Sequence, residues 1–302
     1  MPSITPRDIL TSAKTTISGL TNQVVDLVEI IKPTSTLYAL QLTKIVSKLS
    51  PMLGNLFEFR VVDTLNSQNT ISNGKWVRQD PGFPDARFES ALFPDKNIGV
   101  EIKAWFPFAT EITGRFKDSE DVFKEDTIDV AIIAWLPEYV FWGKPVVLKT
   151  IIVSGKSVAK ARDTHYHNPP HYLVFEPEDT TERTGNLQQT NTNGYVFQDE
   201  RAHPDLYREA QAIVHSWVAN AAVYSTSREY QQMLKTLQAH FPYRLDTNYA
   251  KIDRIEHSEI ETFKTAVMNM VYKNRSVREW QYLAGCDLSD PALIRAINEL
   301  ME

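Results

Sequence analysis

The feature of the sequence that most constrains its fold is a pair of short apolar segments joined by a turn. Residues 86–93 and 98–105 are both rich in apolar side chains, and the Pro-Asp-Lys-Asn stretch at 94–97 between them is typical of a turn. In the second segment apolar and polar residues alternate, as they do in a strand with one buried face. The pattern predicts a β-hairpin that places Glu101 and Lys103 on one face of its second strand.

Asp85 immediately precedes the first of these strands. The hairpin should fold Asp85 back beside Glu101 and Lys103, so that two carboxylates and an ammonium group meet at one point. Carboxylate oxygens are suited to Mg²⁺, which keeps several waters and takes one or two protein carboxylates together with phosphate oxygens. The pattern therefore predicts divalent-metal phosphodiester chemistry, with Asp85 and Glu101 as metal ligands and Lys103 orienting a water.

Pro84, Asp85, Glu101 and Lys103, carried on a hairpin, resemble the motif of the PD-(D/E)xK nuclease superfamily, and within it the type II restriction endonucleases. The resemblance covers about residues 53–153. It implies Mg²⁺-dependent, sequence-specific cleavage of double-stranded DNA by a homodimer, with a cognate DNA methyltransferase as functional partner in the cell. It also implies that the carbonyl of Ile102 completes the metal shell.

The same residues leave other interpretations open. A solvated hairpin with a surface Glu-Lys pair has no catalytic role at all. Within the superfamily, a repair or recombination nuclease and a DNA-binding homologue that no longer cleaves are the alternatives. The chain repeats the Pro-Asp dipeptide at Asp95 and Asp205, but Asp95 lies in the expected turn and no Glu-x-Lys on a strand follows Asp205.

A further carboxylate precedes the hairpin. Residues 51–65 have the apolar spacing of a helix, and Glu58 lies on its apolar margin. Members of the superfamily often carry a glutamate on the helix before the hairpin, so the resemblance makes Glu58 a candidate auxiliary catalytic residue. Alternatively Glu58 pairs with Arg60 or Lys103, or is solvated.

The whole chain divides by pattern into three stretches. We expect an N-terminal helical arm at 1–50, a nuclease core with a recognition loop at 51–203, and a helical region packed on that core at 204–302. In the core, residues 129–135 and 146–153 are apolar enough to be buried strands that flank the motif strand. The expected class is α/β, with a restriction-endonuclease-like central mixed sheet flanked by helices and with N- and C-terminal helical additions.

Helical periodicity marks both ends of the chain. Near the N-terminus the apolar pattern runs from Ile9 to Ile31, stops at Pro33 and resumes from Leu37 to Leu49. Toward the C-terminus helices are expected at 206–224, at 230–239, at 260–272 and after Ser289-Asp290-Pro291, where Ser or Asp caps the helix and Pro occupies its first turn.

Candidate DNA contacts lie after the motif strand. Residues 184–195 are rich in amides and hydroxyls, and side-chain amides read adenine in the major groove, so this segment is either a recognition loop or a polar surface loop without a partner. Its candidate base-reading residues are Asn186, Gln188, Gln189, Asn191 and Asn193. The candidate phosphate contacts are Arg115, Lys117, Lys156, Lys160 and Arg162.

Composition limits the remaining possibilities. A net charge of −6 argues against broad non-specific DNA binding, which depends on Lys and Arg, but not against one basic cleft. The single cysteine, Cys286, excludes an intrachain disulfide and a Cys-based zinc cluster. No apolar run approaches the length of a membrane span and no signal-peptide pattern is present, so a cytoplasmic protein is expected.

Overall fold

The computed structural model describes residues 4–26, 28–80, 82–108, 123, 125–167, 174–175, 195–197, 204–216, 243–245 and 257–302. The chain forms two compact units, the first made of Met1–Ile112, Asp121–Val158 and His257–Glu302 and the second of Thr113–Glu120 and Ala159–Glu256. These units do not coincide with the three expected stretches. The N-terminal helices and the last helices of the chain belong to the same unit as the hairpin.

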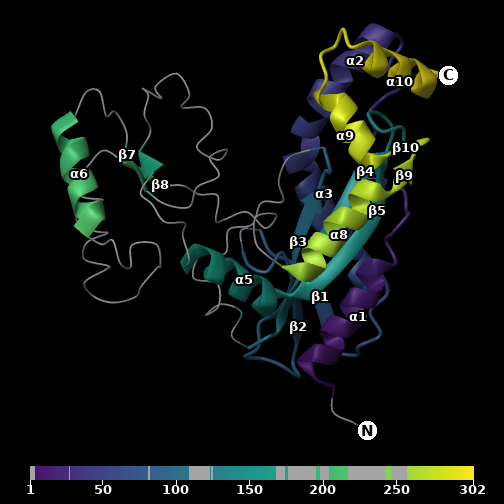
Figure 1. Cartoon of the computed structure of the whole chain (residues 1–302). Coiled ribbons are helices and arrows are strands. Elements are labelled where there is room, and N and C mark those ends of the chain that lie inside the picture. Colours follow the sequence, from purple (N-terminus) through teal and green to yellow (C-terminus); the bar gives the residue numbers. More distant parts are fainter. Residues whose placement is uncertain are drawn as a thin grey trace. The chain divides into compact units, whose positions relative to one another are not determined.

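The first unit is built on a five-stranded mixed sheet (Figure 1). In spatial order its strands are β1 (Gly74–Arg78), β2 (Ala86–Ser90), β3 (Ile98–Trp105), β4 (Ile128–Pro137) and β5 (Pro145–Ser154). The β3–β4 pair is parallel and the other three pairs are antiparallel. A mixed α/β class with a central mixed sheet is therefore confirmed.

The predicted hairpin is present, with β2 and β3 antiparallel and Arg87 opposite Gly99. Two features of the sheet differ from the expectation. Of the two later strands, only β4 lies beside β3, whereas β5 pairs with the far side of β4. The prediction that both later strands flank the motif strand is therefore wrong. The other neighbour of β3 is β2, and β1 was not predicted.

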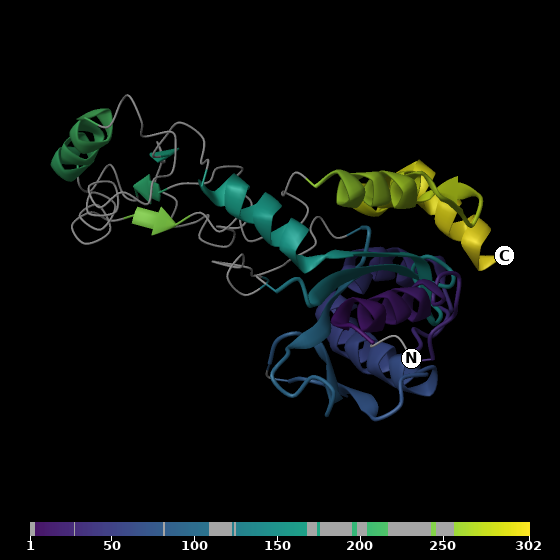
Figure 2. The same ribbon diagram turned by 90° about the horizontal axis from the view of Figure 1, so that it is seen from below.

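Helices cover both faces of this sheet. Helices α1 (Pro6–Ser18) and α3 (Ser50–Ser67) pack on each other and on the sheet, and α8 (Ser258–Asn269) packs on β5. Figure 2 shows the sheet between α1 and α3 on one side and α8 and α9 (Val277–Gly285) on the other. Trp105 at the end of β3 meets Phe263 of α8 with ring centroids 6.0 Å apart, which places a core between this face and the last helices.

The N-terminal stretch is not one helical arm. Helix α1 ends at Ser18, and the chain then runs along the sheet, where Val24 bridges to Val146 and Ile30 to Gly143. The prediction of helix from Ile9 to Ile31 is therefore wrong beyond Ser18. The chain becomes helical again at α2 (Thr36–Ile45), a 3₁₀ turn at Val46–Leu49 and α3.

The C-terminal elements complete the first unit. A short hairpin of β9 (Val271–Tyr272) and β10 (Arg275–Ser276) leads into α9, and α10 (Pro291–Met301) packs on α2. Asp290 caps α10 by accepting from the N–H groups of Ala292 and Leu293, as the sequence predicts, and Pro291 lies in its first turn. The β9–β10 hairpin and α9 were not predicted.

The second unit is described only in part. Its described elements are most of α5 (Gly155–His167), α6 (Pro204–Ser216) and a three-stranded sheet of β6 (Val174–Phe175), β7 (Tyr195–Phe197) and β8 (Tyr243–Leu245). The helix expected at 230–239 lies outside the described residues. In the part of the chain that is described, every helix is too short or too polar to cross a membrane.

Candidate active site

Asp85 is fixed against the strand that carries the other motif residues. Its Oδ2 accepts a hydrogen bond of 2.7 Å from the backbone N–H of Ile102, and its own N–H donates to Glu101 Oε2 at 3.3 Å. On the other side, its carbonyl accepts from the N–H of Gln79 at 2.9 Å. Asp85 lies just before β2, and these bonds hold it beside the middle of β3.

Lys103 joins the two carboxylates. Its Nζ lies 2.6 Å from Glu101 Oε1 and 3.7 Å from Asp85 Oδ2. The side chains of Asp85, Glu101 and Lys103 are only 15, 10 and 21% exposed, so the three charges lie in a partly dehydrated site where their mutual attraction is stronger than in water. The hairpin thus brings together the three residues that the sequence singled out.

Burial and the neighbouring charges shift the pKa values of Glu101 and Lys103. Burial raises the pKa of Glu101, and the charge of Asp85 raises it further, while Lys103 opposes both effects. Burial alone would lower the pKa of Lys103, but the negative charges of Glu101 and Asp85 outweigh it, so that pKa is raised and the amine stays protonated at neutral pH. The site therefore holds a permanent cation beside a carboxylate that favours its proton more than an ordinary glutamate does.

Glu58 of α3 lies at the margin of this cluster. Its Oε2 pairs with Arg78 Nη2 of β1 at 3.0 Å, and the side chain is 17% exposed. Burial raises the pKa of Glu58 and the charge of Asp85 adds to that rise, whereas Arg78 and Lys103 lower it. The charges of Asp85 and Lys103, two members of the cluster, thus both act on Glu58.

The ion-pair partner of Glu58 is Arg78, which the sequence did not indicate. Neither Arg60 nor Lys103 forms the expected ion pair with Glu58, because Arg60 pairs with Asp63 on its own helix. The sequence did not predict β1, and for that reason it did not indicate Arg78 as a partner. Arg78 reaches α3 as part of β1, which pairs with β2. Arg78 also pairs with Asp80 at 2.9 Å.

The donor set suits Mg²⁺. Asp85 and Glu101 supply two carboxylates, and the N–H and C=O of one strand residue point to the same side, so the Ile102 carbonyl faces the side on which Asp85 binds its N–H. Within the described ranges, no three His, Cys, Asp or Glu side chains form a complete metal cage. Mg²⁺ does not require one, because waters and phosphate oxygens complete its shell.

The candidate DNA contacts are less fully placed. Lys156 lies in the first turn of α5 and is exposed, as is Lys160 one turn later. The side chain of Arg162 lies outside the described residues, as do Arg115 and Lys117. The same holds for the base-reading candidates Asn186, Gln188, Gln189, Asn191 and Asn193.

Comparison of the chain with protein-family models, curated proteins and solved structures finds no match. The feature of this chain that bears on function is therefore the cluster of Asp85, Glu101 and Lys103, held by β3 and its hairpin. In that geometry the ammonium of Lys103 lies 2.6 Å from a Glu101 oxygen and 3.7 Å from an Asp85 oxygen.

Proposed function

We propose that the protein is a Mg²⁺-dependent endonuclease that cleaves both strands of DNA at specific sequences, like the type II restriction endonucleases that its motif resembles. The observation that carries the proposal is the convergence of Asp85, Glu101 and Lys103, with Asp85 bound to the backbone of the strand that bears the other two. A surface Glu-Lys pair on a solvated hairpin would not explain why all three side chains are largely buried.

Each residue has a distinct part in the proposed reaction. Mg²⁺, when bound, supplies an acidic centre that polarises the phosphate and lowers the pKa of a water. Asp85 and Glu101 hold that ion, and Glu101 also fixes the position of Lys103 through its 2.6 Å hydrogen bond. In the hydrolysis the water gives up a proton to solvent as its oxygen bonds to phosphorus, the bond from phosphorus to the leaving sugar oxygen breaks, and that oxygen takes up a proton from solvent.

Lys103 acts on the charge that develops during this step. Its raised pKa keeps it cationic, so it can hydrogen-bond the attacking water and offset negative charge on the phosphate. Fixed charges of this kind stabilise a phosphoryl transition state because they need no reorientation as the reaction proceeds. Glu58, held by Arg78, is an auxiliary carboxylate that adds negative charge at the edge of the metal site.

Sequence recognition is assigned in this proposal to residues 184–195, whose amides could bind base edges in the major groove. Lys156, exposed on α5, and Arg115 are proposed to contact phosphates. A cognate DNA methyltransferase would protect the host's own sites from such an enzyme.

The decisive test is incubation of the purified full chain with phage DNA and Mg²⁺. We expect a set of discrete fragments that a chelator abolishes. Progressive degradation from DNA ends would instead indicate a repair exonuclease. Binding without any cleavage under Mg²⁺ would indicate a DNA-binding homologue and contradict the proposed activity.

A further inference from the structure

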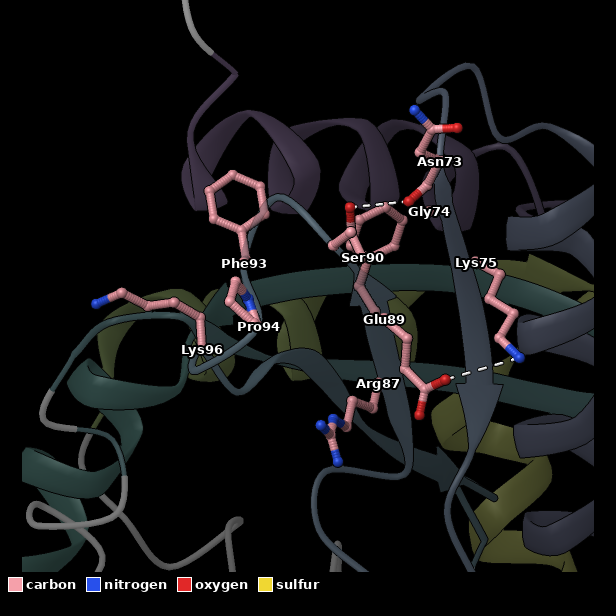
Figure 3. Close-up of a pocket in the computed structure, with 11 residues that line it drawn as sticks. Asn73, Gly74, Lys75, Arg87, Glu89, Ser90, Phe93, Pro94 and Lys96 are labelled. Carbon is pink, nitrogen blue, oxygen red and sulfur yellow. Dashed lines mark hydrogen bonds and ion pairs between the residues drawn. The ribbon is translucent and has the colours of Figure 1, made fainter.

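A second cluster of charged residues lies next to the carboxylate site. An open pocket of about 570 Å³ is formed by β1, β2 and the turn that follows β2. Three basic side chains from separate parts of the chain line it, together with one acidic side chain: Lys75, Arg87, Lys96 and Glu89. Figure 3 shows Arg87 and Glu89 projecting from the same strand, with Lys75 and Lys96 on either side.

Arg87 is the unusual member of this pocket. Lys75 lies 3.7 Å from Glu89, and Lys96 lies 2.7 Å from Glu125 outside the pocket, so both lysines have acidic partners. In contrast, Nε of Arg87 is buried and finds no hydrogen-bond acceptor among the described residues. A buried donor left without a partner costs free energy, and such groups are rare unless a ligand or water satisfies them.

The register of the sheet relates Arg87 to the carboxylate site. Arg87 lies directly opposite Gly99, and opposed residues of an antiparallel pair project from the same face. Glu101 follows Gly99 by two residues on β3, so it shares that face at a Cα separation of about 6 to 7 Å from Gly99. The pocket is lined by neither Asp85 nor Glu101, and is therefore a neighbour of the carboxylate site rather than part of it.

The chemistry of the pocket favours an anion. With three basic side chains and one acidic one its lining is cationic, although the whole chain carries a net charge of −6. A guanidinium presents parallel N–H donors that match two oxygens of a phosphate. Glu89 takes up part of the charge of Lys75, which leaves Arg87 as the group best placed to bind the ligand.

We propose that Arg87 binds a backbone phosphate of the DNA strand close to the one that is cleaved, with Lys75 and Lys96 at the rim of the site. This inference rests on the proposed function, which supplies the DNA. A contact to phosphate carries no sequence information but fixes the position of the strand on the protein. Arg87 is thus a binding and positioning residue beside Asp85, Glu101 and Lys103.

The test is duplex binding by the full chain with Ca²⁺, a cation that occupies carboxylate sites with a looser shell than Mg²⁺. The affinity of Arg87→Ala, Arg87→Lys and the wild type for one labelled duplex is measured at several salt concentrations. Arg278→Ala is the matched control, because Arg278 is exposed on α9 and does not line the pocket. Circular dichroism of each variant checks that it is folded.

We expect Arg87→Ala to bind about tenfold more weakly and to lower the slope of log affinity against log salt by about one. Arg87→Lys should keep most of the slope, because it keeps the charge, and Arg278→Ala should match the wild type. The loss should be equal for duplexes of unrelated sequence.

If Arg87→Ala and Arg278→Ala behave alike while the wild type cleaves DNA, the phosphate site is wrong and the nuclease proposal stands. If Arg87→Ala lowers the slope but the wild type never cleaves, the phosphate site stands and the nuclease proposal is wrong.

Discussion

At the scale of single residues, Glu101 is subject to opposing demands. It must be ionised to hold a cation, yet burial and the charge of Asp85 raise its pKa. A bound divalent ion would favour the ionised form, so protons and metal compete for the same oxygens. As the pH is lowered, the affinity for Mg²⁺ should therefore begin to fall at a higher pH than it would with a glutamate of ordinary pKa.

The pH prediction follows from this competition. Below the raised pKa of Glu101, Mg²⁺ affinity should fall by about tenfold per pH unit for each proton displaced, and above it the affinity should be constant. Isothermal titration with Mg²⁺ at a series of pH values below and above the raised pKa of Glu101 measures this. Glu101→Gln should remove the dependence. If the affinity stays constant as the pH falls, until the pH at which an ordinary glutamate titrates, Glu101 is not the metal ligand with a raised pKa.

Substitution of the motif residues gives the second prediction. Asp85→Asn, Glu101→Gln and Lys103→Met should each lower the cleavage rate by about 100-fold to 1,000-fold or more, because each removes a charge from the site. Single-turnover cleavage of a duplex substrate measures the rate, and circular dichroism checks the fold.

Asp95→Asn is the matched control for these variants. Asp95 also follows a proline, but it is exposed in the turn and distant in register from Glu101. Its substitution should leave the cleavage rate unchanged. Near-normal cleavage by Asp85→Asn together with a defect in Asp95→Asn would show that the other Pro-Asp dipeptide is the functional one.

At the scale of elements, α1 is tied to the sheet by one largely buried charge. Arg7 of α1 donates to Asp129 at the start of β4 over 2.8 Å, and the Asp129 side chain is 3% exposed. Burial raises the pKa of Asp129, and Arg7 opposes that rise. Without Arg7, an uncompensated carboxylate would remain inside the core.

We therefore expect Arg7→Ala to lower the free energy of unfolding by about 1 to 3 kcal/mol, the cost of losing a hydrogen bond to a charged group. The deficit should shrink at low pH, because a protonated Asp129 no longer needs the cation. Urea denaturation at two pH values measures both effects. Arg60→Ala, which removes an exposed pair with Asp63, should change the stability by less than about 1 kcal/mol. Equal losses in the two variants would contradict the role given to Asp129.

The elements also show how much of the fold could be predicted from sequence. Alternation of Ile98, Val100 and Ile102 with polar residues is a local signal, and it located β3 and the face that carries Glu101. The strand β1 has no such signal, since it is short and has only Trp76 fully buried, and it is stabilised by pairing with β2.

The N-terminal error has a similar cause. Apolar periodicity continues past Ser18, but Asn22 adopts a positive φ of 65° and the chain leaves the helix. Its N–H then bonds to the carbonyl of Val147, a residue distant in sequence. The residues of the site also divide into those placed by a local sequence signal and those placed by contacts distant in sequence. The Asp85, Glu101 and Lys103 cluster follows from one hairpin, whereas the Glu58–Arg78 pair depends on how β1 is placed against α3.

At the scale of the whole molecule, the proposed function gives each chain one active site, and one site could not cut two antiparallel DNA strands at once. A two-fold symmetric DNA site is met most simply by two chains related by the same symmetry, so the proposed function predicts a homodimer. Sedimentation should give twice the chain mass of 34.5 kDa for the free protein, or two chains plus one duplex when DNA is bound. Monomers alone, with and without DNA, would contradict this assembly.

Mixed dimers test whether each chain cuts one strand. When wild-type and Asp85→Asn chains are mixed in equal amounts and exchange freely, about half of the dimers contain one of each. Such a dimer should cut only the strand that faces the intact site, so supercoiled plasmid with a single recognition site should accumulate as nicked circles. Wild-type dimers should instead give linear DNA, and Asp85→Asn dimers should leave the plasmid supercoiled.

The ratio of nicked to linear product should rise with the share of variant chains, because each strand is cut by its own Asp85, Glu101 and Lys103. If the mixture gives only linear DNA in proportion to the wild-type share, a single chain cuts both strands in turn and the dimer is not the catalytic unit.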